Sequence, residues 1–184
     1  MAEFIQKHKL FSFYSTLMII VVLIAIFAPW LAPGDAFSSN LSQALQAPSS
    51  QHWFGTDKLG RDVLSRIIYG TQLSLFMGVS IVVIMVSIGT IIGAVAGYFG
   101  GKIEMVLMRL ADIMLSFPGV VLAIAIAGIL GGSIVNTIIA LSVVGWAKYA
   151  RIVRSMTLKV RGEEYVTAAV MMGANTSTIL RRHI

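Results

Sequence analysis

Histidine is the first residue type to consider for metal binding, and the three histidines of this 184-residue chain, His8, His52 and His183, are far apart. No two of them stand three or four residues apart, the spacing that places two ligands on one helical face. The chain has no cysteine, which excludes thiolate ligands, a nucleophilic thiol and disulfides. We therefore expect no metal site and no cofactor.

A stretch with two glycines, Gly55 to Arg61, is a second candidate, because glycine-containing loops can hold phosphate groups. A P-loop needs lysine and then serine or threonine directly after its second glycine. Here Gly60 is followed by Arg61 and Asp62. We expect that the chain does not bind ATP by itself.

Asp112 is an acidic residue inside an apolar run, and a carboxylate in the membrane is costly enough to indicate function. Arg109 lies three residues earlier on the same helical face. We predict an ion pair between Arg109 and Asp112 near the cytoplasmic interface, with a direct functional role of Asp112 as the alternative. A membrane-embedded enzyme would need Asp112 or His52 to be essential and Arg109 dispensable, and no catalytic constellation supports one.

The elements that position these residues are unusually apolar. Hydrophobic residues make up 57% of the chain and charged residues only 12%, against about 25% charged residues in soluble domains. The apolar residues form long runs and lack the periods of 2 or 3.6 typical of half-buried elements. We predict an all-α, polytopic transmembrane protein in a lipid bilayer, with four spans present. The four runs are Phe11–Ala32, Leu73–Tyr98, Met105–Leu130 and Ile134–Ile152.

Three features indicate how the runs meet the membrane. The first run exceeds the apolar region of a signal peptide, about 7 to 15 residues, so we expect an uncleaved anchor with Trp30 at the interface. Pro118 is expected to kink the third run. Trp146 and Tyr149 near the end of the fourth run are expected to be interface anchors.

Small residues recur every fourth position at the end of the second run. This spacing places them on one helical face, where another helix can approach closely. We predict helix packing at this face, although glycine is also simply common in membrane helices. The residues are Gly89, Gly93, Gly97 and Gly101.

The polar segment between the first two runs carries charges of both signs. Asp57, Arg61, Asp62 and Arg66 alternate with apolar residues, a pattern that fits an amphipathic helix lying on the outer face of the membrane. We predict that this segment has a structural role, as a latch that holds neighbouring elements in place. Contact with a substrate is the alternative.

The net charge of +6 does not indicate nucleic-acid binding, because the basic residues cluster at the ends of apolar runs and form no stripe with aromatics. With the N-terminus in the cytoplasm, eleven Lys and Arg lie inside and three outside, as the positive-inside rule favours. The predicted divisions are a cytoplasmic head and anchor (1–32), an extracytoplasmic loop (33–72), three further spans (73–153) and a cytoplasmic tail (154–184).

Three stretches carry motifs that occur together in one family. The first runs from His52-Trp53-Phe54-Gly55-Thr56-Asp57 to Ser74, the second from Gly97-Tyr98-Phe99-Gly100-Gly101 to Phe117-Pro118, and the third from Trp146 to Ile184. Together they resemble the second, C-type permease subunit of the dipeptide, oligopeptide and nickel ABC importers of the bacterial inner membrane.

The third stretch resembles the cytoplasmic loop of such permeases, written Glu-Ala-Ala, three residues, Gly, nine residues and a segment closing in Leu-Pro. Ala168, Ala169 and Gly173 keep this register. Thr167 stands where the leading glutamate is usual, and Ile184 falls just before the expected Leu-Pro.

The composition of this loop predicts two short helices, near Glu163–Met172 and Thr176–Arg182, with a break at Gly173. Small side chains on the first helix let it settle into a partner's groove, while arginines can meet acidic residues at the groove's rim. The residues expected to take part are Arg161, Glu164, Tyr165, Ala168, Ala169, Gly173, Ala174, Arg181 and Arg182.

The resemblance implies a permease subunit of an importer of peptides or nickel, working by alternating access. Its implied partners are a second permease subunit, two cytoplasmic ATPase subunits and an extracytoplasmic solute-binding protein. The family has six spans and four are present, so we expect a chain truncated at its C-terminus, within an incomplete coupling loop. The alternatives are a non-functional fragment and a four-span structural or pore-forming protein that self-associates through Gly89, Gly93 and Gly97.

Overall fold

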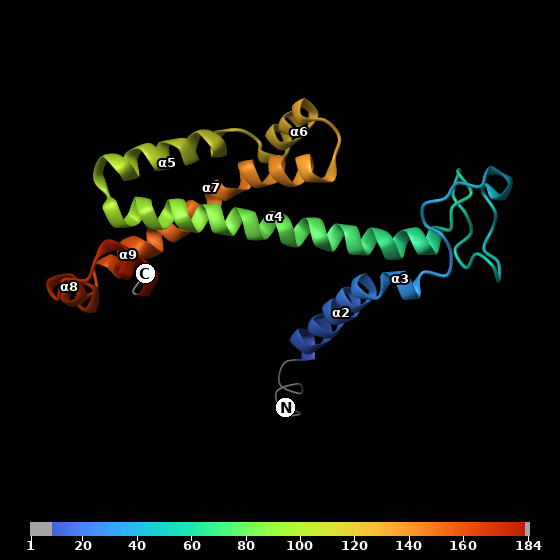
Figure 1. The fold of residues 1–184 in the computed structure, drawn as a ribbon, viewed down its shortest axis with the longest axis horizontal. Coiled ribbons are helices and arrows are strands. Elements are labelled where there is room, and N and C mark those ends of the chain that lie inside the picture. Colours follow the sequence, from blue (N-terminus) through green and yellow to red (C-terminus); the bar gives the residue numbers. More distant parts are fainter. Residues whose placement is uncertain (1–8, 183–184) are drawn as a thin grey trace. The chain divides into compact units, whose positions relative to one another are not determined.

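The computed structural model describes residues 9–182, so His8, His183 and Ile184 lie outside the described part. Helices dominate this part, which contains no strand. In the labels of Figure 1 the elements are α2 (Lys9–Ile26), α3 (Ala28–Leu31), the 3₁₀ helix η1 (Leu41–Gln43), α4 (Val63–Phe99), α5 (Gly101–Ser116), α6 (Gly119–Leu130), α7 (Ile134–Arg161), α8 (Glu164–Met171) and α9 (Thr176–Arg182). The predicted all-α class is confirmed.

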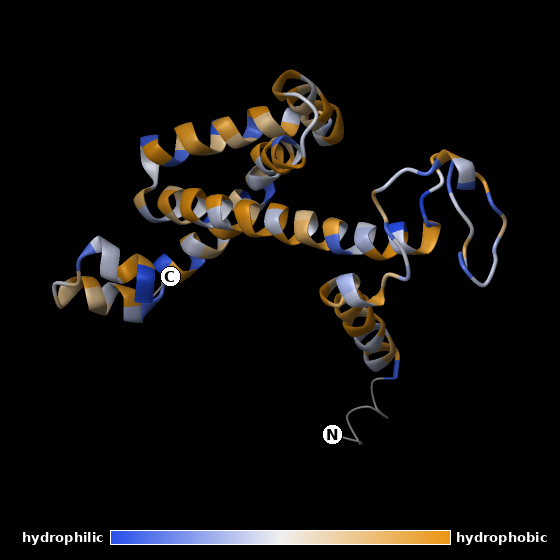
Figure 2. Ribbon diagram, turned by 45° about the vertical axis from the view of Figure 1, so that its right-hand side comes forward, coloured by the Kyte–Doolittle hydropathy of each residue, from blue (hydrophilic) through white to orange (hydrophobic). Residues whose placement is uncertain are grey.

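Two described helices, α2 and α4, are long and apolar enough to cross a membrane. Figure 2 shows apolar residues along most of both. Helices α5 and α6 pass the same test as a pair bent by 91°. The bend falls at Pro118, which has no backbone N–H to donate to the preceding helical turn. The expected kink is therefore a sharp break, and the described spans number two, or three if the bent pair is one span.

The sequence predicts four apolar spans, and the fourth run is the one that does not pass this test of length and composition among the described residues. The fourth run does form a helix, the first two thirds of α7, but it is not among the helices that pass. Asn136, Lys148 and Arg151 lie inside that stretch and lower its hydropathy. A helix enclosed by other helices can carry such residues at lower cost than a lipid-facing one.

The chain forms two units, residues 1–78 and 79–184, and the boundary falls within α4. The second unit is centred on α7, which packs against α5 and α6. Its buried cluster consists of Ala111 from α5 and Trp146, Ala147 and Ala150 from α7. Alanines let the helix backbones approach closely, as in membrane proteins generally.

In the first unit, the expected amphipathic helix is wrong for Asp57 to Asp62 and forms only from Val63 onward, as the start of α4. Residues 52–62 form turns, and α4 begins only at Val63. The reason lies in the acidic side chains, which bond to the backbone locally and so compete with helix formation. Asp62 Oδ2 accepts a hydrogen bond from the Ser65 N–H at 2.8 Å, which makes Asp62 the N-cap of α4.

Asp62 and Ser65, at the start of α4, also bind other parts of the loop. His52 Nδ1 lies 3.0 Å from Asp62 Oδ1, and Ser65 Oγ accepts from the Gly34 N–H at 3.0 Å. Burial raises the pKa of Asp62, but hydrogen bonds from Ser65 and His52 outweigh it, so the pKa lies below its ordinary value. The loop is therefore a structured element held at the start of α4.

Asp57 organises the neighbouring turn. Its Oδ1 accepts from the backbone N–H groups of Leu59 (2.8 Å) and Arg61 (3.0 Å), and its Oδ2 accepts from Arg61 Nε at 2.9 Å. The Arg61 side chain is the main cause that lowers the pKa of Asp57 to about 2. Because the folded pKa is below the unfolded one, this contact stabilises the loop at neutral pH and the stabilisation is lost as pH falls toward 2.

We expect pepsin to cleave the 40–62 loop increasingly as pH falls from about 4 to about 2, the window set by the ordinary and the lowered pKa of Asp57. In Asp57→Asn the loop should already be more sensitive than the wild type at the upper end of this window, so the further rise as pH falls should be smaller. Lys58→Gln is the matched control and should keep the wild-type profile. An identical pH profile in Asp57→Asn would show that this carboxylate does not hold the loop.

Candidate functional site

The loop that follows α7 contains two short helices separated at Gly173. Helix α7 ends at Arg161, with Lys159 and Arg161 in its last turn, where cations favour the helix dipole. The guanidinium of Arg161 lies 6.0 Å from the centre of the Tyr98 ring, a cation–π distance. Arg161, expected at a partner's rim, thus contacts the end of α4.

Gly173 ends α8 in a Schellman motif. Its N–H donates to the Val170 carbonyl at 2.9 Å, and the Ala174 N–H donates to the Ala169 carbonyl at 3.0 Å. Gly173 has a φ of 86°, in the left-handed region that glycine adopts without strain. Asn175 then caps α9, since its Oδ1 accepts from the Thr178 N–H at 2.8 Å. The two helix boundaries match those predicted from the sequence.

Three apolar side chains of this loop are shielded from solvent. Val166, Ala169 and Ile179 are almost fully buried, with Ile179 contributed by α9. The expectation that both Ala168 and Ala169 face a partner is therefore corrected: Ala168 is exposed, whereas Ala169 is buried within the chain. With a period of 3.6 residues, neighbouring positions on a helix point about 100° apart, so one can be buried while the next is exposed.

The outer side of the loop carries two apolar side chains, Met171 and Met172, that were not predicted from the sequence. Met171 and Met172 are 83% and 81% exposed, and Tyr165 and Ala168 are also exposed. Flexible, polarizable methionines are typical of surfaces that adapt to a partner. The sequence feature that could have indicated this surface is the pair of adjacent methionines just before Gly173. We call Tyr165, Ala168, Met171 and Met172 the outer loop surface.

The charged residues of the loop lie at its ends. Glu164 is exposed in the first turn of α8, and Arg181 and Arg182 are exposed in the last turn of α9. These positions suit the helix dipoles. Ala174 is half-buried.

Helices α4 and α7 are in close contact at three of the four predicted glycines. A Cβ added at Gly89 would lie 2.5 Å from Tyr149 Cβ, at Gly93 2.5 Å from the Ala150 carbonyl oxygen, and at Gly97 2.7 Å from Thr157 Cβ. Real Cβ atoms do not approach this closely, so only glycine permits this packing. The face that a self-associating protein would use is already covered by α7 of the same chain.

Gly101 departs from this pattern. Nothing lies within 4 Å of a Cβ added there, and its φ is 53°. It is the first residue of α5, after Gly100 with a φ of 68°. The residue belongs to the reversal between α4 and α5, because the helical period of four ends with α4 at Phe99. Its assignment to helix packing is therefore wrong.

The predicted pair of Arg109 and Asp112 is also corrected. Asp112 Oδ1 pairs with Arg151 Nη2, 39 residues away on α7. Among the described residues no ion pair involves Arg109, whose side chain is exposed. Spacing along one helix shows which side chains can meet, but a neighbouring helix offers a competing partner that spacing does not reveal.

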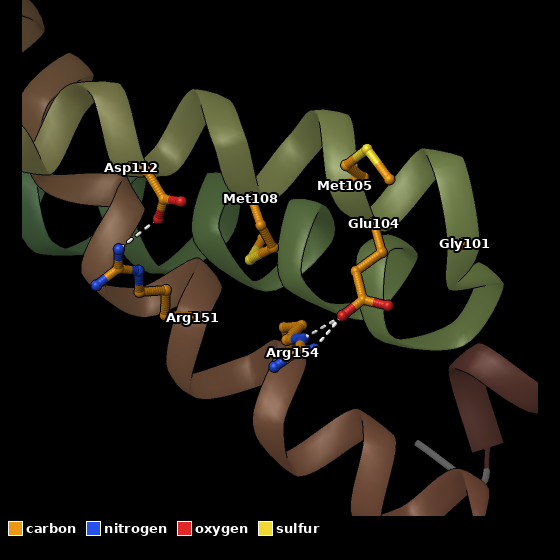
Figure 3. A pocket seen from close by; sticks show the side chains of 7 residues that line it. All are labelled: Gly101, Glu104, Met105, Met108, Asp112, Arg151 and Arg154. Atoms are coloured by element: carbon orange, nitrogen blue, oxygen red, sulfur yellow. Dashed lines mark hydrogen bonds and ion pairs between the residues drawn. The ribbon is translucent and has the colours of Figure 1, made fainter.

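A second pair joins the same two helices. Glu104 Oε1 accepts from Arg154 Nε at 2.7 Å and also from Arg154 Nη2. Between the two pairs lies a pocket of about 510 Å³, lined by Gly101, Glu104, Met105, Met108, Asp112, Arg151 and Arg154. Figure 3 shows Met108 between the pairs, with the acids on α5 and the arginines on α7. We call this the α5–α7 pocket.

The described residues include no group of three or more His, Asp or Glu side chains placed to hold a metal ion. Paired carboxylates and guanidiniums bind charged groups by hydrogen bonds. The second unit thus presents two candidate sites, the outer loop surface and the charged α5–α7 pocket, whose Arg151 lies ten residues before the end of α7.

Comparison with known sequences shows the family of the chain. Residues 89–184 match the family described as binding-protein-dependent transport system inner membrane component. The chain belongs to this family. Residues 5–48 match the N-terminal TM domain of oligopeptide transport permease C, so this member of the family is of the C type and is a multi-pass inner-membrane protein.

Curated relatives cover nearly the whole chain. It is 43% identical over 180 residues to the dipeptide transport system permease protein DppC of Alkalihalophilus pseudofirmus, covering 98% of this chain and 59% of that protein. It is 38% identical over 179 residues to the oligopeptide transport system permease protein OppC of Bacillus subtilis (97% and 59%). For the glutathione transport system permease protein GsiD of Pectobacterium atrosepticum the identity is 40% over 183 residues (99% and 60%). The chain thus spans about three fifths of these relatives' lengths.

Proposed function

We propose that this chain is the C-type permease part of an ATP-driven, binding-protein-dependent importer of short peptides. The relatives named above carry dipeptides, oligopeptides or glutathione in their names, which favours peptides over nickel. The partners are a second permease subunit, two cytoplasmic ATPase subunits and an extracytoplasmic solute-binding protein.

The observation that carries the proposal is the loop after α7. The loop buries Val166, Ala169 and Ile179 and still exposes Met171 and Met172 almost fully. An exposed apolar surface on a structured loop is typical of a protein-binding site. The ATPase is the partner that needs such a surface, since its closure must move the permease as a rigid body.

The orientation in this proposal places the N-terminus and the outer loop surface in the cytoplasm. The Lys and Arg count supports this orientation. With α2, α4, the bent α5–α6 pair and α7 each crossing once, residues 9 and 161 lie on the same side, and the structured 33–62 loop lies outside. Substrate would then leave toward the end of α7 that carries the loop.

Co-purification of the full-length protein with its ATPase, combined with uptake of a labelled dipeptide into vesicles, tests the proposal. We expect ATP-dependent uptake and a stable complex. Gly173→Pro should lose most of the bound ATPase, because proline lacks the N–H bonded to Val170 and cannot adopt the φ of 86°.

Leu41→Asp is the control, since Leu41 is a 71% exposed apolar residue in the 33–62 loop, on the side of the membrane opposite to the proposed ATPase site. It should leave ATPase binding unchanged. An ATPase that stays bound to Gly173→Pro, together with uptake that does not depend on ATP, would reject the proposal.

A further inference from the structure

The α5–α7 pocket has an unusual register. Glu104 and Asp112 are eight residues apart on α5, about 12 Å along the helix, whereas Arg151 and Arg154 are three residues apart on α7, about 4.5 Å. The two arginines therefore diverge to reach acids two turns apart. The divergence leaves the space between the pairs open, and Met108 lies in it (Figure 3).

The charged groups of the pocket have unused hydrogen-bonding capacity. Each carboxylate uses one oxygen, Asp112 Oδ1 and Glu104 Oε1. Their other oxygens accept no hydrogen bond from the described residues. Arg151 donates one hydrogen bond, to Asp112, out of the five N–H groups of a guanidinium. Its side chain is 52% exposed, so these donors are accessible from the pocket.

The pocket thus offers free acceptors and free donors, with the two acids and two arginines balancing in charge. A purely anionic or cationic ligand would meet an equal number of like charges. A ligand that carries one ammonium and one carboxylate can bond to the free oxygens and the free N–H groups while both resident pairs stay intact. A volume of about 510 Å³ lies within the usual range for a small-molecule site.

We infer that the α5–α7 pocket binds the zwitterionic main chain of a short peptide, an inference that rests on the proposed function. The peptide's terminal carboxylate bonds to Arg151, and its terminal ammonium bonds to the free oxygen of Glu104. Met105 and Met108 line the space between them, and their flexible thioethers accommodate different side chains. Since the main chain is common to all peptides, the site accepts many sequences.

The test is a cycle of changes in protein and ligand. The full-length permease is purified in complex with its ATPase, without the solute-binding protein, and binding of labelled Ala-Ala-Ala is measured by equilibrium dialysis. Arg151→Gln should weaken binding of the free peptide about ten- to a hundredfold, the size of one hydrogen bond to a charged group. For Ala-Ala-Ala amide, which lacks the carboxylate, the same variant should change affinity little.

This coupling distinguishes a ligand contact from a structural role. If Arg151→Gln weakens both peptides equally, the arginine only maintains the fold and the inference is rejected. Arg151→Lys should recover part of the affinity for the free peptide. Arg109→Gln is the matched control, because Arg109 is an exposed arginine on α5 that does not line the pocket, and it should bind like the wild type.

The contact between the peptide's ammonium and Glu104 is tested separately. N-acetyl-Ala-Ala-Ala should bind the wild-type complex about ten- to a hundredfold more weakly than the free peptide, and Glu104→Gln should not weaken it further. Equal binding of the acetylated and free peptides, or no saturable binding, rejects the inference. The proposed function stands independently if the same complex keeps its ATPase and its ATP-driven uptake.

Discussion

Replacing Gly93 with alanine is expected to loosen the contact between α4 and α7 and to destabilise the protein by about 1 to 3 kcal/mol, the usual effect of overpacking. The new methyl group would lie 2.5 Å from the Ala150 carbonyl oxygen and 2.8 Å from Val153 Cβ. A backbone oxygen on a rigid helix cannot move aside without displacing the helix. Thermal unfolding in detergent and the steady-state level in the membrane measure the effect.

Gly78→Ala is the control on the same helix. Nothing lies within 4 Å of a Cβ added at Gly78, and alanine favours helix over glycine by about 1 kcal/mol. Gly78→Ala should therefore be as stable as the wild type or more stable. Equal behaviour of the two variants would mean that α4 and α7 do not pack through this face.

A second large effect is expected at the outer loop surface. Changing both Met171 and Met172 to aspartate should weaken ATPase binding about 30-fold or more, as loss of an interface hot spot does. Two charges would have to be buried without partners. Co-purification at increasing salt and ATP-driven uptake measure the loss.

Ala169 provides the contrast for this prediction. Ala169→Arg would place a cation in the buried core beside Val166 and Ile179, so it tests the fold of the loop. The double methionine variant changes only exposed side chains, and the helix content of the loop should stay unchanged. If the ATPase binds this variant normally, the partner uses another surface.

The parts of the structure governed by local chemistry were predictable from the sequence. Gly173 separates α8 from α9 because a left-handed residue ends a helix, and Pro118 separates α5 from α6 for lack of an N–H group. The four-residue spacing of Gly89, Gly93 and Gly97 indicated a face for close packing, although it could not name α7 as the partner. In each case one residue type determines the backbone or the approach distance.

The errors arose where the partner is distant in sequence. Asp112 had a suitable neighbour in Arg109, but α7 brings Arg151 beside it. Ala168 and Ala169 are chemically alike, and only the tertiary packing of the loop decides that Ala169 is buried and Ala168 exposed. In the 52–62 loop the alternation of charge suggested a helix, whereas Asp57 and Asp62 bond to nearby backbone N–H groups.

Helix α7 is unbroken over 28 residues, from Ile134 to Arg161. At 1.5 Å per residue it is about 42 Å long, and a tilt of about 10° moves one end by roughly 7 Å relative to the other. The α5–α7 pocket lies between the two ends, with Arg151 about 15 Å from Arg161. If α7 tilts as a rigid body at its loop end, Arg151 and Arg154 therefore move along an arc relative to the acids of α5.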